Sequence, residues 1–346
     1  MRIVIADDGI PFDGDSFGKG PLGGAESCVV WLAEAMAAQG HEVICLTRCQ
    51  QTVLRAGVRW VPLYDAPAWT STAVDLFIAN RGNKVLDLAA QWAAPIRRLV
   101  FWIHNPARYL MKRRYLWRIW RQKPILVFLS QAHARTYPGW APGRRAVIPH
   151  GVSPLFSPQR HTTPPPPRAA YLSNPHRGLG LLLDLWEKRI LPRLPQAELH
   201  LFTGSAIMAR SEADLPETAA LLTRAGHMPG VTLHGAVPRE QLADRLNGMR
   251  AFCYPAVVEE SFCLAAAETQ ALGLPGVVTA LGALPERVIN GSTGFVTPDN
   301  DWNAFAEALL AVLEKDVLWS RLHQATCDGP VRRWADVAHD FIRLAD

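Results

Sequence analysis

The sequence lacks several patterns that identify common classes of protein. Its six cysteines contain no CxxC pair, which argues against a zinc ribbon. No GxxxxGK[ST] segment occurs, which argues against a P-loop nucleotide site. No apolar run approaches the ~20 residues that cross a bilayer, and the opening MRIVIADDG lacks the architecture of a signal peptide. These absences favour a cytoplasmic protein with buried, reduced thiols, and they leave open a peripheral position on the inner face of the cytoplasmic membrane.

What the sequence does contain is material for two globular cores. The 346 residues are 49% hydrophobic and 19% charged, which is a folded rather than a disordered composition. At ~150 residues per domain, this length predicts two domains. The net charge of +5, from 36 Lys and Arg against 31 Asp and Glu, favours anionic partners without identifying one.

Short apolar segments alternate with helical patterns along the whole chain, and this alternation predicts parallel sheets covered on both faces. The pattern pauses at the four prolines 164–167, which fit neither a helix nor a central strand. We therefore predict two doubly wound, Rossmann-like α/β domains facing a cleft, because ligands of such sheets bind at the carboxyl ends of the strands. The expected division is an N-terminal domain 1–160, a proline-rich linker 161–167, a C-terminal domain 168–328 and a final helix in 329–346.

A glycine-rich loop, GPLGGAES (Gly20 to Ser27), lies between the first strand and the first helix. Its adjacent Gly23 and Gly24 would let the backbone approach a phosphate near the N-terminus of that helix. A tight turn without a ligand explains the same residues equally well. The nearby acids Asp13 and Asp15 superficially resemble a metal-binding pair, but a polar loop is the simpler interpretation, and we expect no metal.

Two polar positions are expected at domain edges. His104 follows the apolar strand RLVFW, so it should emerge where α/β sites form, although a structural histidine capping a strand is a fair alternative. Arg177 comes just before a predicted helix, where a guanidinium can bind phosphate; a surface loop arginine is the alternative.

The stretch EESFCLAAAETQ places Glu260 just before a predicted helix and Glu268 in its second turn. If the helix begins near Phe262, the amides of 261–264 are unpaired donors that favour an anion. Carboxylates on either side would suit the hydroxyls of a nucleotide-linked sugar. A capped helix with a solvated acid is the alternative.

The stretch with Glu260 and Glu268 resembles the E-x7-E motif of glycosyltransferase family 4. The members of this family are retaining enzymes with the GT-B fold. The downstream course ALGLPGVVTALGALPERVINGSTGFVTP is similar to that family too. The upstream segments GPLGGAES, WIHN and VIPHGVSPLF are also similar to segments of that family, and they occur in the same order. The matches run from residue 4 to about residue 298, and the E-x7-E with its context is the specific one.

The resemblance implies a role for each position. Glu268 would bind the ribose hydroxyls, Glu260 the hydroxyls of the transferred sugar, and His104 the donor sugar near the reacting carbon. The remaining donor contacts would come from Ser261, Phe262, Cys263, Leu264, Gly23, Gly24 and Arg177, the last standing where the family usually has a phosphate-binding lysine. The final helix would cross back onto the N-terminal domain.

Three positions depart from the family pattern: Leu172 replaces an arginine, His150 an asparagine and Ala283 a glycine. Ser173, Asn174 or His176 could compensate for Leu172. The resemblance implies a hexosyltransferase that moves a sugar from a nucleoside-diphosphate sugar to an acceptor such as a glycolipid or cell-envelope polysaccharide precursor, without a metal or other cofactor. A sugar-nucleotide epimerase and a non-catalytic nucleotide-sugar-binding protein stay as alternatives.

The segment 107–123 contains seven basic residues, no acid, and interleaved aromatic and aliphatic residues. As one helix it would be basic and amphipathic, which favours contact with an anionic membrane surface or a phosphorylated glycolipid acceptor. The candidate contacts are Arg108, Lys112, Arg113 and Arg114. An ordinary helix packed on the sheet is the alternative. RNA binding has no accompanying signature, so we expect no nucleic-acid partner.

Overall fold

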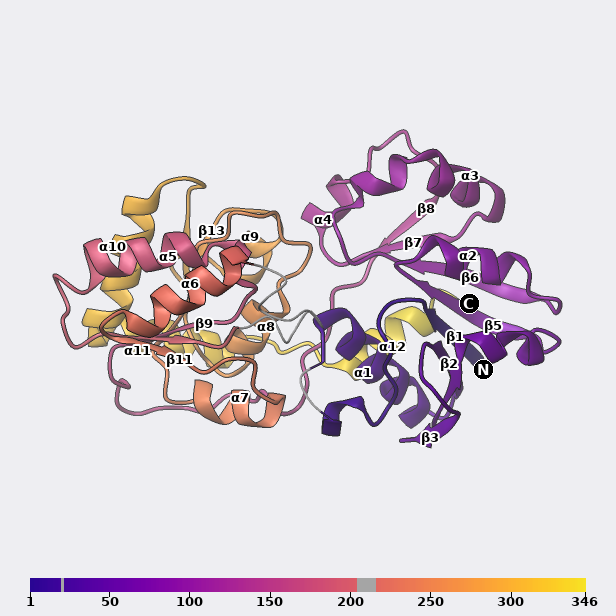
Figure 1. The fold of residues 1–346 in the computed structure, drawn as a ribbon, viewed down its shortest axis with the longest axis horizontal. Coiled ribbons are helices and arrows are strands. Elements are labelled where there is room, and N and C mark those ends of the chain that lie inside the picture. The colour runs from indigo at the N-terminus through magenta and orange to yellow at the C-terminus, as the bar shows by residue number, and fades with distance from the viewer. Residues whose placement is uncertain (20–21, 204–215) are drawn as a thin grey trace. The chain divides into compact units, whose positions relative to one another are not determined.

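The computed structural model describes residues 1–19, 22–203 and 216–346. The chain forms two compact units, each an α/β sandwich around its own sheet (Figure 1). Unit 1 comprises Met1–Gly151 together with Arg332–Asp346, and unit 2 comprises Val152–Val331. The first and last segments of the chain therefore belong to the same unit.

Unit 1 is built on an eight-stranded sheet of order β3-β4-β2-β1-β5-β6-β7-β8. Neighbouring strands run parallel, apart from the antiparallel pair of β3 with β4. The apolar sequences of the central strands are buried, as expected for strands covered on both faces, whereas the edge strands β3 and β8 contain no buried residue. The strands are β1 (Arg2–Asp7), β2 (Glu42–Thr47), β3 (Val53–Arg55), β4 (Val58–Pro62), β5 (Val74–Asn80), β6 (Ile96–Trp102), β7 (Ile125–Phe128) and β8 (Arg144–Val147).

The helices of unit 1 lie on both sides of this sheet, with α2 and α3 on one side and α1 with α12 on the other (Figure 1). They are α1 (Gly24–Ala38), α2 (Asn83–Ala90), α3 (Arg113–Gln122), α4 (Gln131–Arg135) and α12 (Trp334–Ile342), with 3₁₀ turns η1 (Ser16–Lys19), η2 (Leu63–Trp69) and η3 (Ala107–Met111). The return of α12 confirms the predicted crossing of the final helix. Its Trp334 ring lies 5.6 Å from that of Trp31 on α1, and Gly151 passes so close that a Cβ there would come within 2.6 Å of the α12 backbone.

Unit 2 is built on a six-stranded, wholly parallel sheet of order β11-β10-β9-β12-β13-β14. The strands are β9 (Arg168–Tyr171), β10 (Glu198–Leu201), β11 (Val231–Leu233), β12 (Ala251–Tyr254), β13 (Gly276–Thr279) and β14 (Gly294–Thr297). The helices and turns are η4 (Pro175–Arg177), α5 (Leu179–Leu185), the π-helical turn η5 (Trp186–Ile190), α6 (Pro216–His227), α7 (Arg239–Leu246), α8 (Leu264–Ala271), α9 (Leu284–Arg287), α10 (Trp302–Glu314) and α11 (Asp316–Asp328).

The proline-rich segment is not a separate linker but part of unit 2, which begins at Val152. Phe156 is fully buried in a cluster with Leu272, and the amide of His161 donates to Nε2 of His323 over 3.0 Å. Proline lacks an N–H but keeps its carbonyl, and Pro165 O accepts from the buried Arg250. The division between the units therefore lies at Gly151–Val152, before the expected 161–167.

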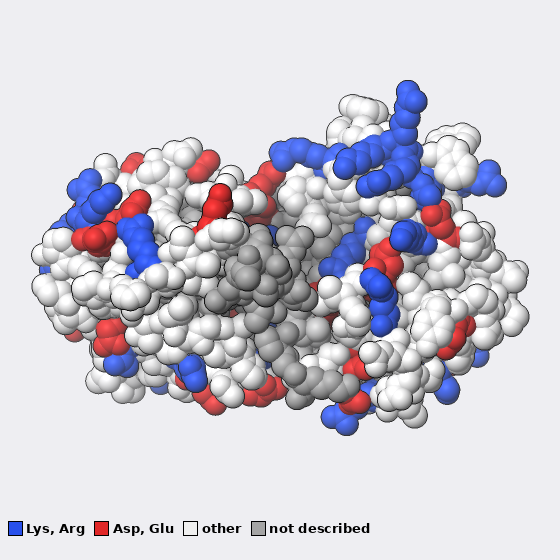
Figure 2. Space-filling view, viewed as in Figure 1, with Lys and Arg blue, Asp and Glu red and all other residues white. Residues whose placement is uncertain are grey.

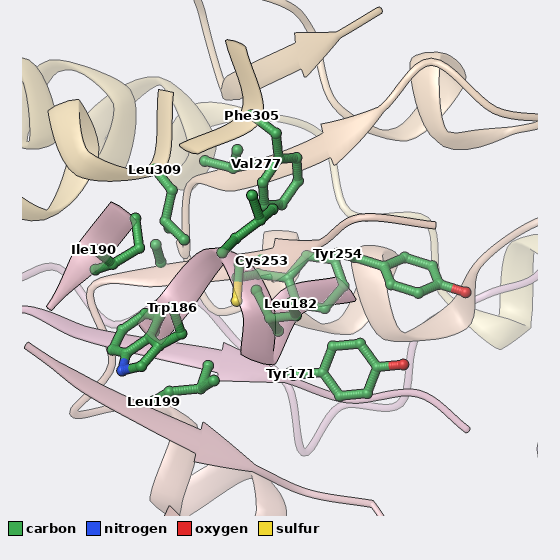
Figure 3. Packing of buried hydrophobic residues seen from close by; sticks show 14 of the residues in the cluster. Tyr171, Leu182, Trp186, Ile190, Leu199, Cys253, Tyr254, Val277, Phe305 and Leu309 are labelled. Atoms are coloured by element: carbon green, nitrogen blue, oxygen red, sulfur yellow. The ribbon is translucent and has the colours of Figure 1, made fainter. Parts of the chain in front are cut away.

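The core of unit 2 packs aromatic and aliphatic side chains from the sheet against α5 and α10 (Figure 3). In this view the rings of Tyr171 and Tyr254 belong to the packed cluster, and their hydroxyl oxygens point away from it on the same side. All six cysteines lie among the described residues, are buried and form no disulfide. No helix in the described part of the chain is long and apolar enough to cross a membrane.

Candidate active site

Three neighbouring strands of unit 1 bring polar residues together at their carboxyl ends. Asp7 ends β1 and Asn80 ends β5, and the two are register partners. His104 follows β6, the next strand in the sheet. Asp7 and Asn80 are completely buried, so each requires hydrogen-bond partners within the protein.

These residues form a hydrogen-bonded chain. His104 Nε2 lies 2.7 Å from Asn80 Oδ1, and Asn80 Nδ2 donates to Asp7 Oδ2 over 2.5 Å. Asp7 also accepts the Gly9 amide over 2.7 Å. The predicted emergence of His104 at the strand ends is therefore what the structure shows, and its ring is tied to two residues that the sequence did not single out.

Arg81 connects this chain to helix α1. Its guanidinium contacts both oxygens of Asp7 at 3.1 and 3.2 Å and donates to Glu26 Oε1 over 2.6 Å. Burial opposes the charge of Arg81, but Asp7 and Glu26 outweigh it and raise the pKa of the guanidinium. Arg81 also has a positive φ of 51°, a backbone conformation that is uncommon for non-glycine residues and clusters at functional sites.

His104 is held in its neutral form by its surroundings. Burial, followed by the nearby His150, Arg81 and His133, lowers the pKa of His104 well below its usual range. Its ring also lies 4.6 Å from that of Trp102 and 5.3 Å from that of His150. At neutral pH this imidazole is a hydrogen-bonding group rather than a cation.

The glycine loop ends at Gly23, the N-cap of α1, and Gly24 begins that helix. A Cβ built on Gly23 would come within 2.3 Å of Glu26 Oε2, so a side chain there would displace the partner of Arg81. Among the described atoms, none lies within 4 Å of a Cβ built on Gly24. Gly20 and Pro21 of this loop lie outside the described residues. Asp13 and Asp15, the acids that resemble a metal-binding pair in the sequence, lie in a turn, where Asp13 Oδ1 accepts a hydrogen bond from the Asp15 amide over 2.9 Å.

In unit 2, Glu260 is the centre of a second polar cluster. One of its oxygens, Oε1, accepts from Arg177 Nη1 and from the Tyr254 hydroxyl, each over 2.6 Å. Glu260 is only 8% exposed. Burial and the adjacent carboxylate raise the pKa of Tyr254, so the phenol keeps its proton and donates it. The structure thus joins two of the predicted residues directly and adds Tyr254 to them.

Two glycines allow the loops that carry these side chains to approach each other. Gly178, directly after Arg177, has a φ of 122°, and a Cβ there would lie 2.1 Å from the carbonyl oxygen of Pro255. Gly282 has a φ of 59°, and a Cβ there would lie within 2.6 Å of the Glu260 backbone nitrogen. Both positions require a residue without a side chain.

Helix α8 begins at Leu264, two residues later than the sequence suggested. The residue before it, Cys263, is in the left-handed region with a φ of 65°, a strained backbone of the kind that clusters at ligand sites. The start of the helix is therefore shifted from 261–264 to the residues after Cys263, and its first intrahelical bond runs from the Ala267 amide to the Cys263 carbonyl over 3.2 Å. Phe262 instead faces Arg287, whose guanidinium lies 4.6 Å from the ring centre.

Glu268 lies in the second turn of α8, as predicted, and is 3% exposed. Its Oε1 accepts from the guanidinium of Arg239 at the start of α7. Burial raises the pKa of Glu268, and the charge of Arg239 counteracts part of that rise. Glu260 and Glu268 are thus both buried carboxylates, and each is paired with an arginine.

The sequence of unit 2 carries the decisive comparison. Residues 168–315 match the family described as glycosyl transferases group 1. The chain is a glycosyltransferase, and unit 2 contains its group 1 domain. This agrees with the resemblance drawn from Glu260, Glu268 and their surroundings.

Relatives of this glycosyltransferase differ in how much of the chain they share. The phosphatidyl-myo-inositol mannosyltransferase of Mycobacterium leprae is 27% identical over 359 aligned positions, which cover 93% of this chain and 92% of that protein. The D-inositol 3-phosphate glycosyltransferase of Kribbella flavida is 39% identical over 98 residues, 28% of this chain and 23% of its own length. The whole chain thus has a curated counterpart of similar length.

Solved structures show that the glycosyltransferase has the GT-B fold. Sucrose-phosphate synthase from Thermosynechococcus elongatus superposes with a TM-score of 0.75 at 19% identity, covering 99% of this chain and 98% of that one. HepE from Anabaena, solved in complex with UDP-glucose, gives 0.74 at 16% identity with the same coverage. Both expectations drawn from the resemblance, the GT-B fold and the glycosyltransferase activity, are confirmed.

One departure of this glycosyltransferase from the family pattern, Leu172, has a local explanation. Leu172 is partly buried against the core, so its position offers no phosphate contact. Ser173 donates to the Tyr254 hydroxyl over 3.3 Å, and His176 contacts Thr218. Ser173 therefore lies in the Glu260 cluster, whereas His176 is engaged elsewhere.

The basic segment is not one helix, because it divides at Lys112 into η3 and α3. Helix α3 buries Tyr115 and Ile119 and exposes Trp117 and Trp120, at 55% and 66%. Its exposed side gathers Lys and Arg over this part of unit 1 (Figure 2). The apolar side of α3 thus packs on the sheet, as the alternative interpretation of the sequence expected, and the opposite side is basic and aromatic.

Proposed function

We propose that this glycosyltransferase belongs to family 4 and transfers its sugar with retention of the anomeric configuration to a membrane glycolipid that carries a phosphate. The observation that carries the proposal is the pair of buried, arginine-paired carboxylates eight residues apart, Glu260 and Glu268, on either side of the start of α8. Retention is inferred from the resemblance to family 4.

The donor site follows from the charges in unit 2. Arg177 and the first amides of α8 supply the positive potential that a departing nucleoside diphosphate requires. Because these groups belong to the protein, we propose that the reaction needs no metal. Glu268 would accept the ribose hydroxyls, and the second oxygen of Glu260 would accept a hydroxyl of the transferred sugar. Gly24, where a Cβ would have no described atom within 4 Å, would contribute a backbone contact, and the neutral His104 a hydrogen bond to the donor sugar.

A panel of nucleoside-diphosphate sugars tests the donor assignment. The true donor should raise the melting temperature of the enzyme and undergo slow hydrolysis without acceptor, and Glu260→Gln should abolish transfer. Glu259→Gln is the matched control, because Glu259 is a neighbouring acid with no assigned role. Proton NMR of the fresh product reports the anomer. An inverted product would contradict retention, and a donor converted to its epimer would indicate an epimerase.

The acceptor class rests on the exposed side of α3, which we call the basic–aromatic face: Arg108, Lys112, Arg113, Arg114, Trp117, Trp120, Arg121 and Trp140. All eight side chains are exposed. The loop bearing Trp140 lies against α3, since a Cβ on Gly143 would come within 3.2 Å of Ile119. Exposed tryptophans among cations are typical of proteins that settle at a lipid–water interface. The names of the relatives, which include a phosphatidyl-inositol and an inositol-phosphate acceptor, support the same class.

Co-sedimentation with vesicles tests the membrane contact. Vesicles rich in phosphatidylglycerol should retain the protein at low salt, and vesicles of phosphatidylcholine alone should not. Arg113→Glu with Arg114→Glu should release it, because each basic residue near an anionic surface contributes ~1 kcal/mol. Lys188→Glu with Arg321→Glu reverses two exposed charges of unit 2 and should not. Equal retention of both double variants would contradict a role for the basic–aromatic face.

A further inference from the structure

We propose that Asn80 and Asp7 are positioning residues that fix His104 as a neutral imidazole carrying its proton on Nε2, so that Nδ1 is the hydrogen-bond acceptor of the ring. The inference deepens the proposed function and rests on it in one respect, the contact of His104 with the donor sugar. Its consequence is a statement about specificity: His104 accepts a hydrogen bond from a sugar hydroxyl rather than donating one.

The direction of every hydrogen bond in the chain follows from the charge at its buried end. Asp7 already accepts from the Gly9 amide and from the Arg81 guanidinium, which requires an ionised carboxylate. A carboxylate accepts only, so Asn80 must turn its NH₂ group toward Asp7. The reverse orientation would set two oxygen acceptors 2.5 Å apart.

With the Asn80 amide so oriented, its Oδ1 faces His104. The 2.7 Å contact between Oδ1 and Nε2 is then a hydrogen bond only if Nε2 carries the proton. A neutral imidazole has one proton, so Nδ1 keeps its lone pair. The tautomer is therefore set by Asp7, two residues away along the chain of hydrogen bonds, through the side chain of Asn80.

The groups around His104 oppose a second proton on the ring. The cationic Arg81 lies at the far side of Asn80, and His150 stacks near the ring from the segment after β8. His133 on α4 also contributes to the lowered pKa of His104, and its own Nε2 contacts the carbonyl of Asn105. The fixed tautomer and the neutral state thus have the same origin in the geometry of the strand ends.

The far end of the network is anchored so that Asp7 cannot turn away. Arg81 holds Asp7 and Glu26 at once, and the turn that presents it is tight, with the Gly82 amide 2.6 Å from the carbonyl of Asn80. Glu26 lies in the first turn of α1, two residues after Gly24. The same carboxylate–guanidinium pair therefore ties the imidazole of His104 to the glycine loop within unit 1.

Nitrogen-15 NMR of the full-length protein with labelled histidine tests the tautomer without reference to activity. His104→Gln identifies the signals of His104 among the eleven histidines. The wild-type ring should show a protonated Nε2 and an unprotonated Nδ1 between pH 6 and 8. Asn80→Ala should yield a mixture of tautomers, and Asn80→Asp should raise the pH at which the ring becomes protonated, because a carboxylate beside it stabilises the imidazolium. A wild-type proton on Nδ1, or tautomers unchanged in Asn80→Ala, would overturn the inference.

Kinetics separate this inference from the proposed function. Asn80→Ala should lower kcat by about 10–100-fold, the range for residues that orient a functional group, while the KM for donor changes less. Asn80→Asp should lose activity selectively on the acidic side of the pH profile. Thr47→Val is the control, because it removes a buried hydrogen bond, 2.7 Å to the Phe12 carbonyl, at the end of neighbouring strand β2. If His104→Ala transfers sugar normally, the proposed contact of His104 with the donor sugar is wrong, but the tautomer measured by NMR is unaffected. If His104→Ala loses activity but NMR does not show the expected tautomer, only the positioning role of Asn80 and Asp7 is wrong.

Discussion

The two units use buried carboxylates differently near the carboxyl ends of their strands. In unit 1, the carboxylate of Asp7 is completely buried and reaches the functional ring of His104 only through Asn80. In unit 2, the carboxylate of Glu260 is itself the group proposed to contact the ligand, and it is held directly by Arg177 and Tyr254. Unit 1 therefore presents a neutral imidazole, whereas unit 2 presents charges.

This difference predicts how each unit should respond when a buried carboxylate is replaced. A carboxylate that only positions other groups contributes to stability, because its hydrogen bonds hold three strands and a helix together. A carboxylate kept for a ligand is stabilised less well by its own protein, as the raised pKa of Glu268 indicates. Removing the two kinds of carboxylate should therefore have opposite consequences.

The largest effect is expected from Asp7→Asn. This change leaves Arg81 with one carboxylate fewer and confronts Asn80 with an amide, so the free energy of unfolding of unit 1 should fall by about 3–5 kcal/mol, as for other broken buried pairs. Hydrogen exchange read on β1 and β5 measures it separately from unit 2. Asp75→Asn is the control, since Asp75 is only partly buried and accepts a single amide. An equal loss of stability in both variants would contradict the claim that Asp7 stabilises unit 1 more than Asp75 does.

Glu268→Gln should give the opposite pattern. We expect donor binding about 10–100-fold weaker, because a charge-assisted hydrogen bond contributes about 1.5–3 kcal/mol. The stability of unit 2 should change by less than about 1 kcal/mol, because the neutral amide escapes the desolvation that raises the pKa of Glu268. Calorimetric titration with the donor measures the affinity, and chemical denaturation measures the stability of unit 2. A loss of stability as large as that of Asp7→Asn would erase the contrast between the units.

Tyr254→Phe probes how directly Glu260 is held. Losing the 2.6 Å hydrogen bond to Oε1 should lower kcat/KM by about 5–30-fold, equivalent to about 1–2 kcal/mol. The phenylalanine keeps the packing of the ring in the core. Ser173→Ala removes a longer, 3.3 Å contact to the same hydroxyl together with an interaction with Tyr171, leaves the bond to Glu260 in place, and should have a smaller effect. Steady-state kinetics of both variants decide the order.

The smallest effect concerns pH. The native pKa of His104 is lowered, whereas in the unfolded chain it is ~6.5. The unfolded state therefore takes up a proton first as the pH falls, and the stability that a neutral His104 gives unit 1 is lost from about pH 6.5 down to the native pKa, at up to ~1.4 kcal/mol per pH unit. Exchange on β5 and β6 at pH 5 and pH 7 should show this dependence reduced in His104→Gln. An unchanged dependence would mean that other groups of unit 1 cause it.

The two sites also differ in how much of them could be predicted. Glu260 and Glu268 were found because their spacing is a property of the chain itself. Asn80 and Asp7 were not singled out, although each ends an apolar strand, because nothing local shows that β1, β5 and β6 are neighbours in the sheet. Arg239 was missed for the same reason, since it lies 29 residues from Glu268. The helix start at Leu264 was misplaced because the strained backbone of Cys263 has no sequence signal.

By itself, the sequence determined the two α/β units and the E-x7-E stretch, because hydrophobic periodicity and short-range spacing are carried by consecutive residues, whereas the return of the final helix was implied by the resemblance to the family. Only the tertiary structure decided that the proline segment packs on unit 2, that Arg239 pairs with Glu268, and that Asp7 acts on His104 through Asn80. These facts depend on which strands and helices become neighbours, and that choice is made by the burial of whole faces rather than by any one segment of the chain.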